Sequence, residues 1–155
     1  MPFISLNSPV GPLTIFADDD AIVSVDWGWA AENDEPPGAL LETAREQMEA
    51  YFEKKLERFD LPLTLHGTPF QRKVWSAIAA IPFGKVRTYG DLARELDTGA
   101  RSLGGACGRN PIPIIVPCHR VLASDGGLGG YSGMDGLDTK RFLLRLEGVS
   151  LKSLA

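Results

Sequence analysis

The chain contains few cysteines and histidines. Among its 155 residues there are two of each, at Cys107, Cys118, His66 and His119. Two cysteines make no disulfide framework of the kind found in small secreted domains. The four side chains together lack the spacing of a zinc site. We therefore expect no bound metal, no cofactor and a reducing, cytoplasmic location.

Long hydrophobic runs are also missing. No apolar stretch approaches the ~20 residues that a membrane-spanning helix requires, so we expect no membrane partner. The opening residues MPFISLNSP do not show a basic segment followed by an apolar one, and we expect no secretory signal. A hydrophobic content of 44% and a charged content of 23% are ordinary for a globular protein with a real core. The length fits one compact unit or two small ones.

The net charge of −4 is unevenly distributed along the chain. Residues 1–66 carry 13 acidic and 4 basic side chains, whereas residues 67–124 carry 3 acidic and 8 basic ones; residues 125–155 are balanced. A basic block inside an acidic chain is typical of a surface that contacts phosphates. Helical surfaces also carry such a bias for solubility alone, so the charge pattern does not decide between the two interpretations.

The first third of the sequence predicts a small β-meander followed by a helix. Short apolar runs separated by Pro, Gly and Asp predict strands, and apolar residues at helical spacing predict a helix from Leu40 onward. The strands are Phe3–Leu6, Leu13–Phe16 and Ala21–Trp27, and the apolar helix positions are Leu41, Ala44, Met48, Tyr51, Phe52 and Lys55. Nothing in this segment points to chemistry, and we interpret it as a scaffold.

A boundary is expected at His66-Gly67, which divides the chain into residues 1–66 and 67–155. The second part begins with Thr68-Pro69-Phe70-Gln71. Thr at the N-cap, Pro at the first helical position and Gln three residues after the cap predict a capping box. The helix then continues with an apolar stripe formed by Phe70, Val74, Ile78 and Ile81.

Two further helices are predicted within the basic block. Thr88 caps the first, Tyr89–Leu96, and a turn containing Gly99 leads to the second, Ala100–Cys107. Helix, tight turn and helix form a helix-turn-helix pattern, which also occurs in many folds that never bind DNA.

The second of these helices carries few long side chains. Arg101 and Ser102 are followed by Leu103 and the pair Gly104-Gly105. A helix that identifies bases in the major groove usually carries long polar side chains. A bare surface suits close approach of the backbone, as in the narrower minor groove. The alternative is that the glycines allow tight packing against a neighbouring helix.

The residues most suggestive of chemistry follow a stiff, apolar segment. Residues 111–117 include three prolines and lead directly into Cys118-His119-Arg120. A cysteine with an ordinary pKa is only a few per cent ionised at neutral pH, so a nucleophilic thiol needs a base. His119 can serve as that base through a bridging water, oriented by a carboxylate, for which Glu147 is the best candidate. A cysteine beside a histidine is often accidental, and the pair alone does not establish a site.

Several motifs in order along the chain resemble the O6-alkylguanine-DNA alkyltransferases, also called methylated-DNA–protein-cysteine methyltransferases. The resemblance runs from about Phe52 to Gly148. The motifs are Gly67-Thr68-Pro69-Phe70-Gln71 with Val74-Trp75, Ile81-Pro82-Phe83-Gly84, Tyr89-Gly90, the Arg101 helix, Asn110-Pro111, Pro117-Cys118-His119-Arg120-Val121, Gly129-Gly130-Tyr131-Ser132-Gly133 and Leu146-Glu147-Gly148.

The resemblance implies a fold and an activity. The fold is an α/β N-terminal subdomain similar to ribonuclease H, followed by a mostly helical subdomain with a winged helix-turn-helix. The implied activity is irreversible transfer of an alkyl group from O6 of guanine to Cys118, once per protein molecule. The implied partner is double-stranded DNA containing O6-alkylguanine, bound through its minor groove by a monomer.

The resemblance also assigns roles to individual residues. Cys118 is the implied alkyl acceptor, and His119 with Glu147 is its water-linked base. Asn110 stiffens the turn before the active-site segment, Tyr89 helps rotate the nucleotide out of the duplex, and Arg101 fills the gap in the base stack. Carbonyls at Cys118 and Val121 accept from the guanine amino group. The implied pocket residues are Tyr131, Ser132 and Lys140, and the implied DNA contacts are Arg101, Ser102, Gly104, Gly105, Arg120 and Thr88.

The sequence departs from the family in two places. Met134-Asp135 are extra residues in the loop before the last helix, and Ser102-Leu103 replace a common Ala-Val pair. Three other functions agree less well with the sequence. A binding-only alkyltransferase-like damage sensor lacks the nucleophile that Cys118 supplies here. A transcription regulator does not suit the bare Arg101 helix, and a cysteine hydrolase requires an oxyanion hole that no motif indicates.

Overall fold

The computed structural model describes residues 1–18, 20–31, 35–129 and 136–150. The chain folds into two compact units, Met1–His66 and Gly67–Ala155. Among the described residues, no helix combines the length and the apolar character needed to cross a membrane.

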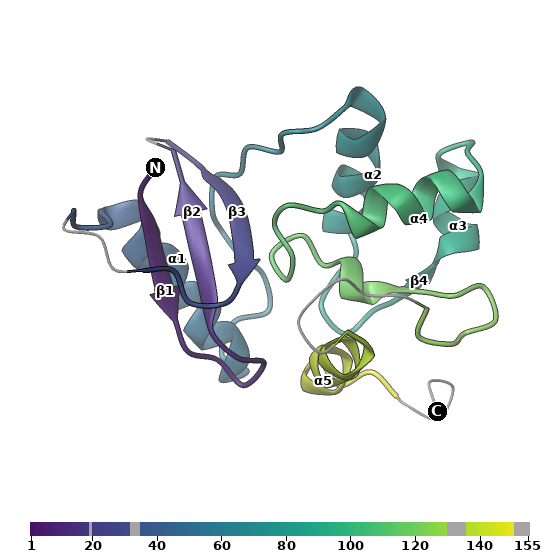
Figure 1. Cartoon of the computed structure of the whole chain (residues 1–155). Coiled ribbons are helices and arrows are strands. Elements are labelled where there is room, and N and C mark those ends of the chain that lie inside the picture. The colour runs from purple at the N-terminus through teal and green to yellow at the C-terminus, as the bar shows by residue number, and fades with distance from the viewer. Residues whose placement is uncertain (19, 32–34, 130–135, 151–155) are drawn as a thin grey trace. The chain divides into compact units, whose positions relative to one another are not determined.

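The N-terminal unit is built on a three-stranded antiparallel meander. Its strands are β1 (Phe3–Leu6), β2 (Leu13–Ala17) and β3 (Ile22–Trp27), with β2 in the centre (Figure 1). The three predicted strands are therefore present, each within one residue of its expected bounds. A single bridge between Ile22 and Leu63 attaches the end of the unit to β3.

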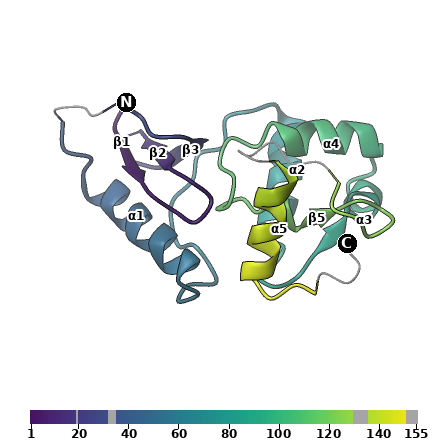
Figure 2. The ribbon, with the colours of Figure 1, turned by 60° about the horizontal axis from the view of Figure 1, so that its bottom comes forward.

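The predicted helix, α1 (Ala39–Phe52), covers one face of this sheet (Figures 1 and 2). Its buried residues are four of the predicted apolar positions, Leu41, Ala44, Met48 and Tyr51. Including Lys55 in that stripe was wrong, because the helix ends at Phe52 and Lys55 is exposed. The chain leaves the helical conformation at Lys54, whose φ of 62° lies in the left-handed region.

The C-terminal unit begins with α2 (Pro69–Ala79), and its capping box is confirmed. The Thr68 side chain accepts from the Gln71 amide, and the Gln71 side chain accepts from the Thr68 amide. Val74, Ile78 and Trp75 are buried on this helix.

The two helices predicted within the basic block lie after α2. They are α3 (Tyr89–Glu95), which follows β4 (Arg87–Thr88), and α4 (Ala100–Gly108), and Thr88 caps α3 as predicted. α4 packs against both α2 and α3. The remaining elements are the 3₁₀ turn η1 (Cys118–Arg120), β5 (Val121–Leu122), which pairs in parallel with β4, and α5 (Leu137–Leu146).

Candidate active site around Cys118

The segment that leads to Cys118 is buried and tightly turned. Every residue from 112 to 118 is buried, as its apolar composition predicts. Asn110 ties the turn together, because its Nδ2 donates to the Val116 carbonyl at 2.8 Å and its Oδ1 accepts from the Ile112 amide at 2.9 Å. Ile114 has a φ of 73°, which is unfavourable for a β-branched residue. The surrounding contacts thus hold the turn that fixes Cys118 in place.

Cys118 begins η1 and is 7% exposed. Removal from water raises the pKa of its thiol, and this effect outweighs the contact from Asn110 and the charge of Lys140, which act in the opposite direction. The resting cysteine is therefore a neutral thiol, and it needs a base to become a nucleophile.

His119 provides a suitable base. Its Nε2 lies 2.6 Å from Oε2 of Glu147, and both side chains are completely buried. Burial lowers the pKa of His119, so the ring is neutral at rest. A neutral ring bonded through Nε2 to a carboxylate carries its proton on Nε2. Its Nδ1 is then an acceptor, and this buried atom makes no hydrogen bond with any described residue.

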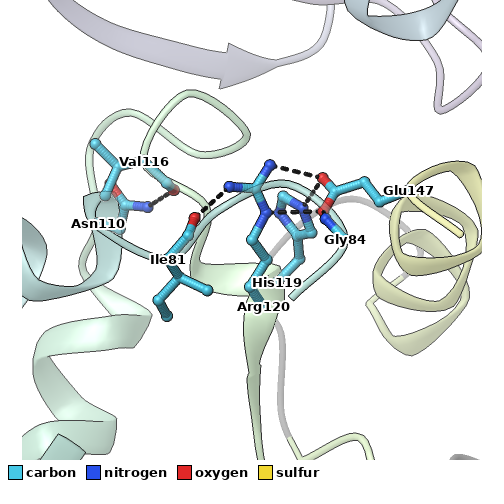
Figure 3. Close-up of polar contacts among 7 residues, drawn as sticks. All are labelled: Ile81, Gly84, Asn110, Val116, His119, Arg120 and Glu147. Atoms are coloured by element: carbon cyan, nitrogen blue, oxygen red, sulfur yellow. Dashed lines mark hydrogen bonds and ion pairs between the residues drawn. The ribbon is translucent and has the colours of Figure 1, made fainter. Parts of the chain in front are cut away.

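The Glu147 carboxylate is also bound by Arg120, which contacts both of its oxygens (Figure 3). Nε and Nη2 of Arg120 donate to Oε1 and Oε2 at 2.7 and 3.0 Å, and Nη1 donates to the Ile81 carbonyl at 2.6 Å. Arg120 was expected to contact DNA, but it is only 6% exposed and its guanidinium faces these internal partners. We correct that interpretation: the buried carboxylate attracts the guanidinium inward.

Lys140 is a buried cation that interacts electrostatically with Cys118. It is fully buried on α5, and its Nζ donates to the Val121 carbonyl at 2.7 Å and lies 5.9 Å from the centre of the Tyr89 ring. Burial lowers the pKa of Lys140 to about 8 and raises the pKa of Tyr89 to about 12. The Val121 carbonyl, expected to accept from guanine, thus already accepts from Lys140.

Part of the expected pocket falls outside the described residues. These positions are Tyr131 and Ser132, together with the additional residues Met134 and Asp135.

One face of α4 is formed by the exposed residues Arg101, Gly105 and Gly108 and the half-buried Gly104, at the spacing of one helical face. A Cβ atom added to any of the three glycines would meet no described atom within 4 Å. The glycines therefore do not serve packing against a neighbouring helix, and that alternative is wrong. Ser102 is exposed beside this face, whereas Thr88 is partly buried and its hydroxyl is engaged in capping α3.

Two structural contributions were missed from the sequence. One is the Arg120 contact with Glu147. The other is Trp75, whose buried Nε1 donates to the Ala106 carbonyl at 2.8 Å and so fixes α4 on α2. A tryptophan next to the apolar stripe of α2 was a signal for the second contact.

Comparisons with known proteins agree with this architecture. The family model of the 6-O-methylguanine DNA methyltransferase ribonuclease-like domain matches residues 2–65, and that of the DNA binding domain matches residues 69–149. The chain is 41% identical over 156 residues to the methylated-DNA–protein-cysteine methyltransferase of Methanosarcina acetivorans, covering 96% of this chain and 99% of the relative. It is 41% identical over 153 residues to the protein of the same name from Mycobacterium tuberculosis, covering 92% of this chain and 90% of the relative.

Solved structures give the same result. A crystal structure of Mycobacterium tuberculosis OGT in complex with DNA has a TM-score of 0.85 at 41% identity, covering 95% of this chain and 92% of the other. An O6-methylguanine DNA methyltransferase from Methanococcus jannaschii has a TM-score of 0.68 at 30% identity, covering 98% and 97%. The chain belongs to the 6-O-methylguanine DNA methyltransferase family, with a ribonuclease-like N-terminal domain and a helical DNA-binding domain.

Proposed function

We propose that this protein repairs double-stranded DNA by transferring the alkyl group of O6-alkylguanine to Sγ of Cys118. The observation that carries the proposal is the arrangement of the buried thiol, beside a neutral histidine whose Nε2 is bonded to Glu147. This arrangement supplies a nucleophile and its base within a member of a methyltransferase family.

The transfer is a displacement at the alkyl carbon. The thiol proton passes through a water to Nδ1 of His119, the S–C bond forms, and the C–O6 bond breaks with its electron pair leaving on guanine. The leaving base needs hydrogen-bond donors or a proton. Tyr89 and Lys140 both lie beside Cys118, and burial keeps the phenol of Tyr89 protonated, so both can donate. The thioether product has no easy reversal, and each molecule acts once.

The depth of Cys118 requires the damaged base to leave the duplex. O6 of a paired guanine lies within the stack, and flipping costs a few kcal/mol, less for a damaged pair. We assign Arg101, exposed at the start of α4, to the gap that the base leaves. The glycine face of α4 suits close contact with a minor groove.

We further propose that α3 and α4 form a winged helix-turn-helix. The packing of α3 on α4 and the β4–β5 pair that flanks them support this arrangement. Three further points stay predictions. Residues 67–155 are expected to carry DNA binding and alkyl transfer, with residues 1–66 as a separate subdomain. The protein is also expected to be cytoplasmic and to act as a monomer.

The alternative is a damage sensor that binds without transfer. The intact Cys118 and its adjacent His119–Glu147 pair favour the transferase, because a sensor has no need of a base beside a thiol.

The proposal is tested by intact-protein mass after incubation with a duplex containing O6-methylguanine. We expect the mass to rise by one methyl-for-hydrogen replacement, to saturate at one per protein, and to stay unchanged in Cys118→Ala. Cys107→Ala is the matched control, since it removes the other cysteine and should still be methylated. Lesion-selective binding without a mass change would support the sensor instead.

A further inference from the structure

Arg120 connects three separate parts of the C-terminal unit. It lies on η1, its Nη1 donates to the carbonyl of Ile81 just after α2, and its Nε and Nη2 donate to Glu147 at the end of α5. Figure 3 shows the guanidinium between these two partners. Bidentate pairing of this kind fixes both the position and the plane of a carboxylate.

The pairing of Arg120 with Glu147 determines how the carboxylate binds His119. With a guanidinium against both of its oxygens, Glu147 remains an ionised acceptor and its Oε2 takes the Nε2 proton of His119. The outer partner of a histidine selects which ring nitrogen carries the proton. The unprotonated nitrogen is then Nδ1, which is the atom that the proposed transfer uses.

We infer that Arg120 is a positioning residue for alkyl transfer, which holds the Glu147 carboxylate so that Nδ1 of His119 stays available as the base. The inference rests on the proposed function. It gives Arg120 a role within the protein instead of a contact with DNA.

The charges around His119 determine the expected pH effect. Arg120 comes from η1, and α5 contributes Lys140 and, at its end, Glu147; the buried residues of α2, Val74, Trp75 and Ile78, are apolar. Glu147 raises the pKa of His119, whereas Arg120 and Lys140 lower it. Removing the Arg120 charge leaves Glu147 less opposed, so the pKa of His119 must rise. The protonated ring then loses its base function at a higher pH than in the wild type.

The experiment measures the single-turnover rate of methyl transfer to the full-length protein between about pH 5 and pH 8, the range in which histidine titrates. In Arg120→Met we expect the acid limb of the profile to move to higher pH by about one unit, the effect of losing a nearby charge. Arg145→Met removes the same charge from an exposed position on α5 and should leave the profile unchanged.

Arg120→Lys is the second variant, because it keeps the charge but cannot pair in bidentate fashion. We expect its acid limb to stay near that of the wild type while its plateau rate falls about tenfold, as misplaced catalytic groups produce. It also provides a test if Arg120→Met does not fold, which thermal melting will show.

The outcomes separate the two proposals. A lysine variant with the wild-type plateau overturns the positioning role. So does a folded methionine variant that is slower but keeps the wild-type acid limb, since a merely structural residue does not move that limb. Failure of the wild type to transfer in the same assay refutes the proposed function instead.

Discussion

At the scale of single residues, burial shifts four titratable side chains of the site, those of Cys118, Tyr89, His119 and Lys140, toward their uncharged forms. It raises the pKa of Cys118 and Tyr89 and lowers the pKa of His119 and Lys140. Such surroundings suit a neutral purine base better than an anionic phosphate, because charge in a desolvated site is costly. The basic charge that attracts DNA has to lie elsewhere, on the exposed surface.

Lys140 gives a stability prediction with a defined sign. Its folded pKa of about 8 lies below the ordinary lysine value of 10.5, so the unfolded chain binds its proton more readily. Folding therefore carries a penalty that is complete below pH 8 and disappears as the pH rises toward 10.5. Replacing Lys140 by Met removes this penalty, although the Val121 carbonyl loses its donor.

We therefore expect the stability of Lys140→Met relative to wild type to fall by about 2 kcal/mol between about pH 7 and pH 10. Urea unfolding at both pH values measures the change. Lys85→Met, at an exposed position, is the control and should show no such pH dependence. A difference that stays constant with pH would show that burial does not depress the Lys140 pKa.

The sequence pointed to the candidate cysteine and to the carboxylate beside His119 more readily than to the internal contact of Arg120. The bond between His119 and Glu147 is present, as expected from a carboxylate at the end of the last helix. The direction of the Arg120 side chain was not predictable, because it depends on a 3₁₀ turn and on a carboxylate 27 residues away. The neighbouring sequence does not show whether a side chain on such a short turn points into the protein or toward solvent.

At the scale of secondary structure, α4 contains two adjacent glycines that lower its helical stability and that packing does not require. Gly104 and Gly105 have open space where a Cβ would lie, and glycine costs up to about 1 kcal/mol in a helix relative to alanine. A sequence selected for stability would carry alanine at these positions. We attribute the glycines to close approach of DNA.

Gly104→Ala and Gly105→Ala are therefore expected to stabilise the protein by up to about 1 kcal/mol. They should weaken duplex binding about tenfold, since overpacking a close contact costs about 1–3 kcal/mol. Thermal melting and fluorescence titration with a labelled duplex measure the two effects in the same samples.

Ser76→Ala is the matched control, at an exposed position on α2, and should stabilise without changing affinity. Unchanged binding by both glycine variants would mean that α4 does not approach DNA closely through this face.

Elements with strong local signals were predictable, and those without them were not. A capping box marked the start of α2 and the Thr88 N-cap marked the start of α3, and the β-meander followed from short apolar runs separated by turn residues. β4 and β5 have two residues each, which is too short for any periodicity, and their parallel pairing joins segments 34 residues apart. Such a pair is determined by the tertiary packing of the unit.

At the scale of the whole molecule, a chain of net charge −4 can bind DNA only if its basic side chains are concentrated in one region. Within residues 67–124, all of which the structure describes, Arg120 is buried against Glu147, and Arg87 and Arg94 pair with Glu95 and Asp91. Five exposed basic side chains of this segment have no acidic partner among the described residues: Arg72, Lys73, Lys85, Arg101 and Arg109. These side chains are the candidates for phosphate contacts.

This distribution predicts how binding depends on salt. Each phosphate contact releases about one counterion, so the logarithm of the binding constant falls linearly with the logarithm of salt concentration. Replacing Arg109 by Gln, at the end of the exposed α4 face, should weaken binding and reduce the magnitude of this slope by about 1. Arg58→Gln makes the same charge change at an exposed position in residues 1–66, and its slope should equal that of the wild type. Titrations of both variants across a salt series test this directly. Equal slope changes in the two would mean that the total charge of the chain, and not the local basic surface, governs its attraction to DNA.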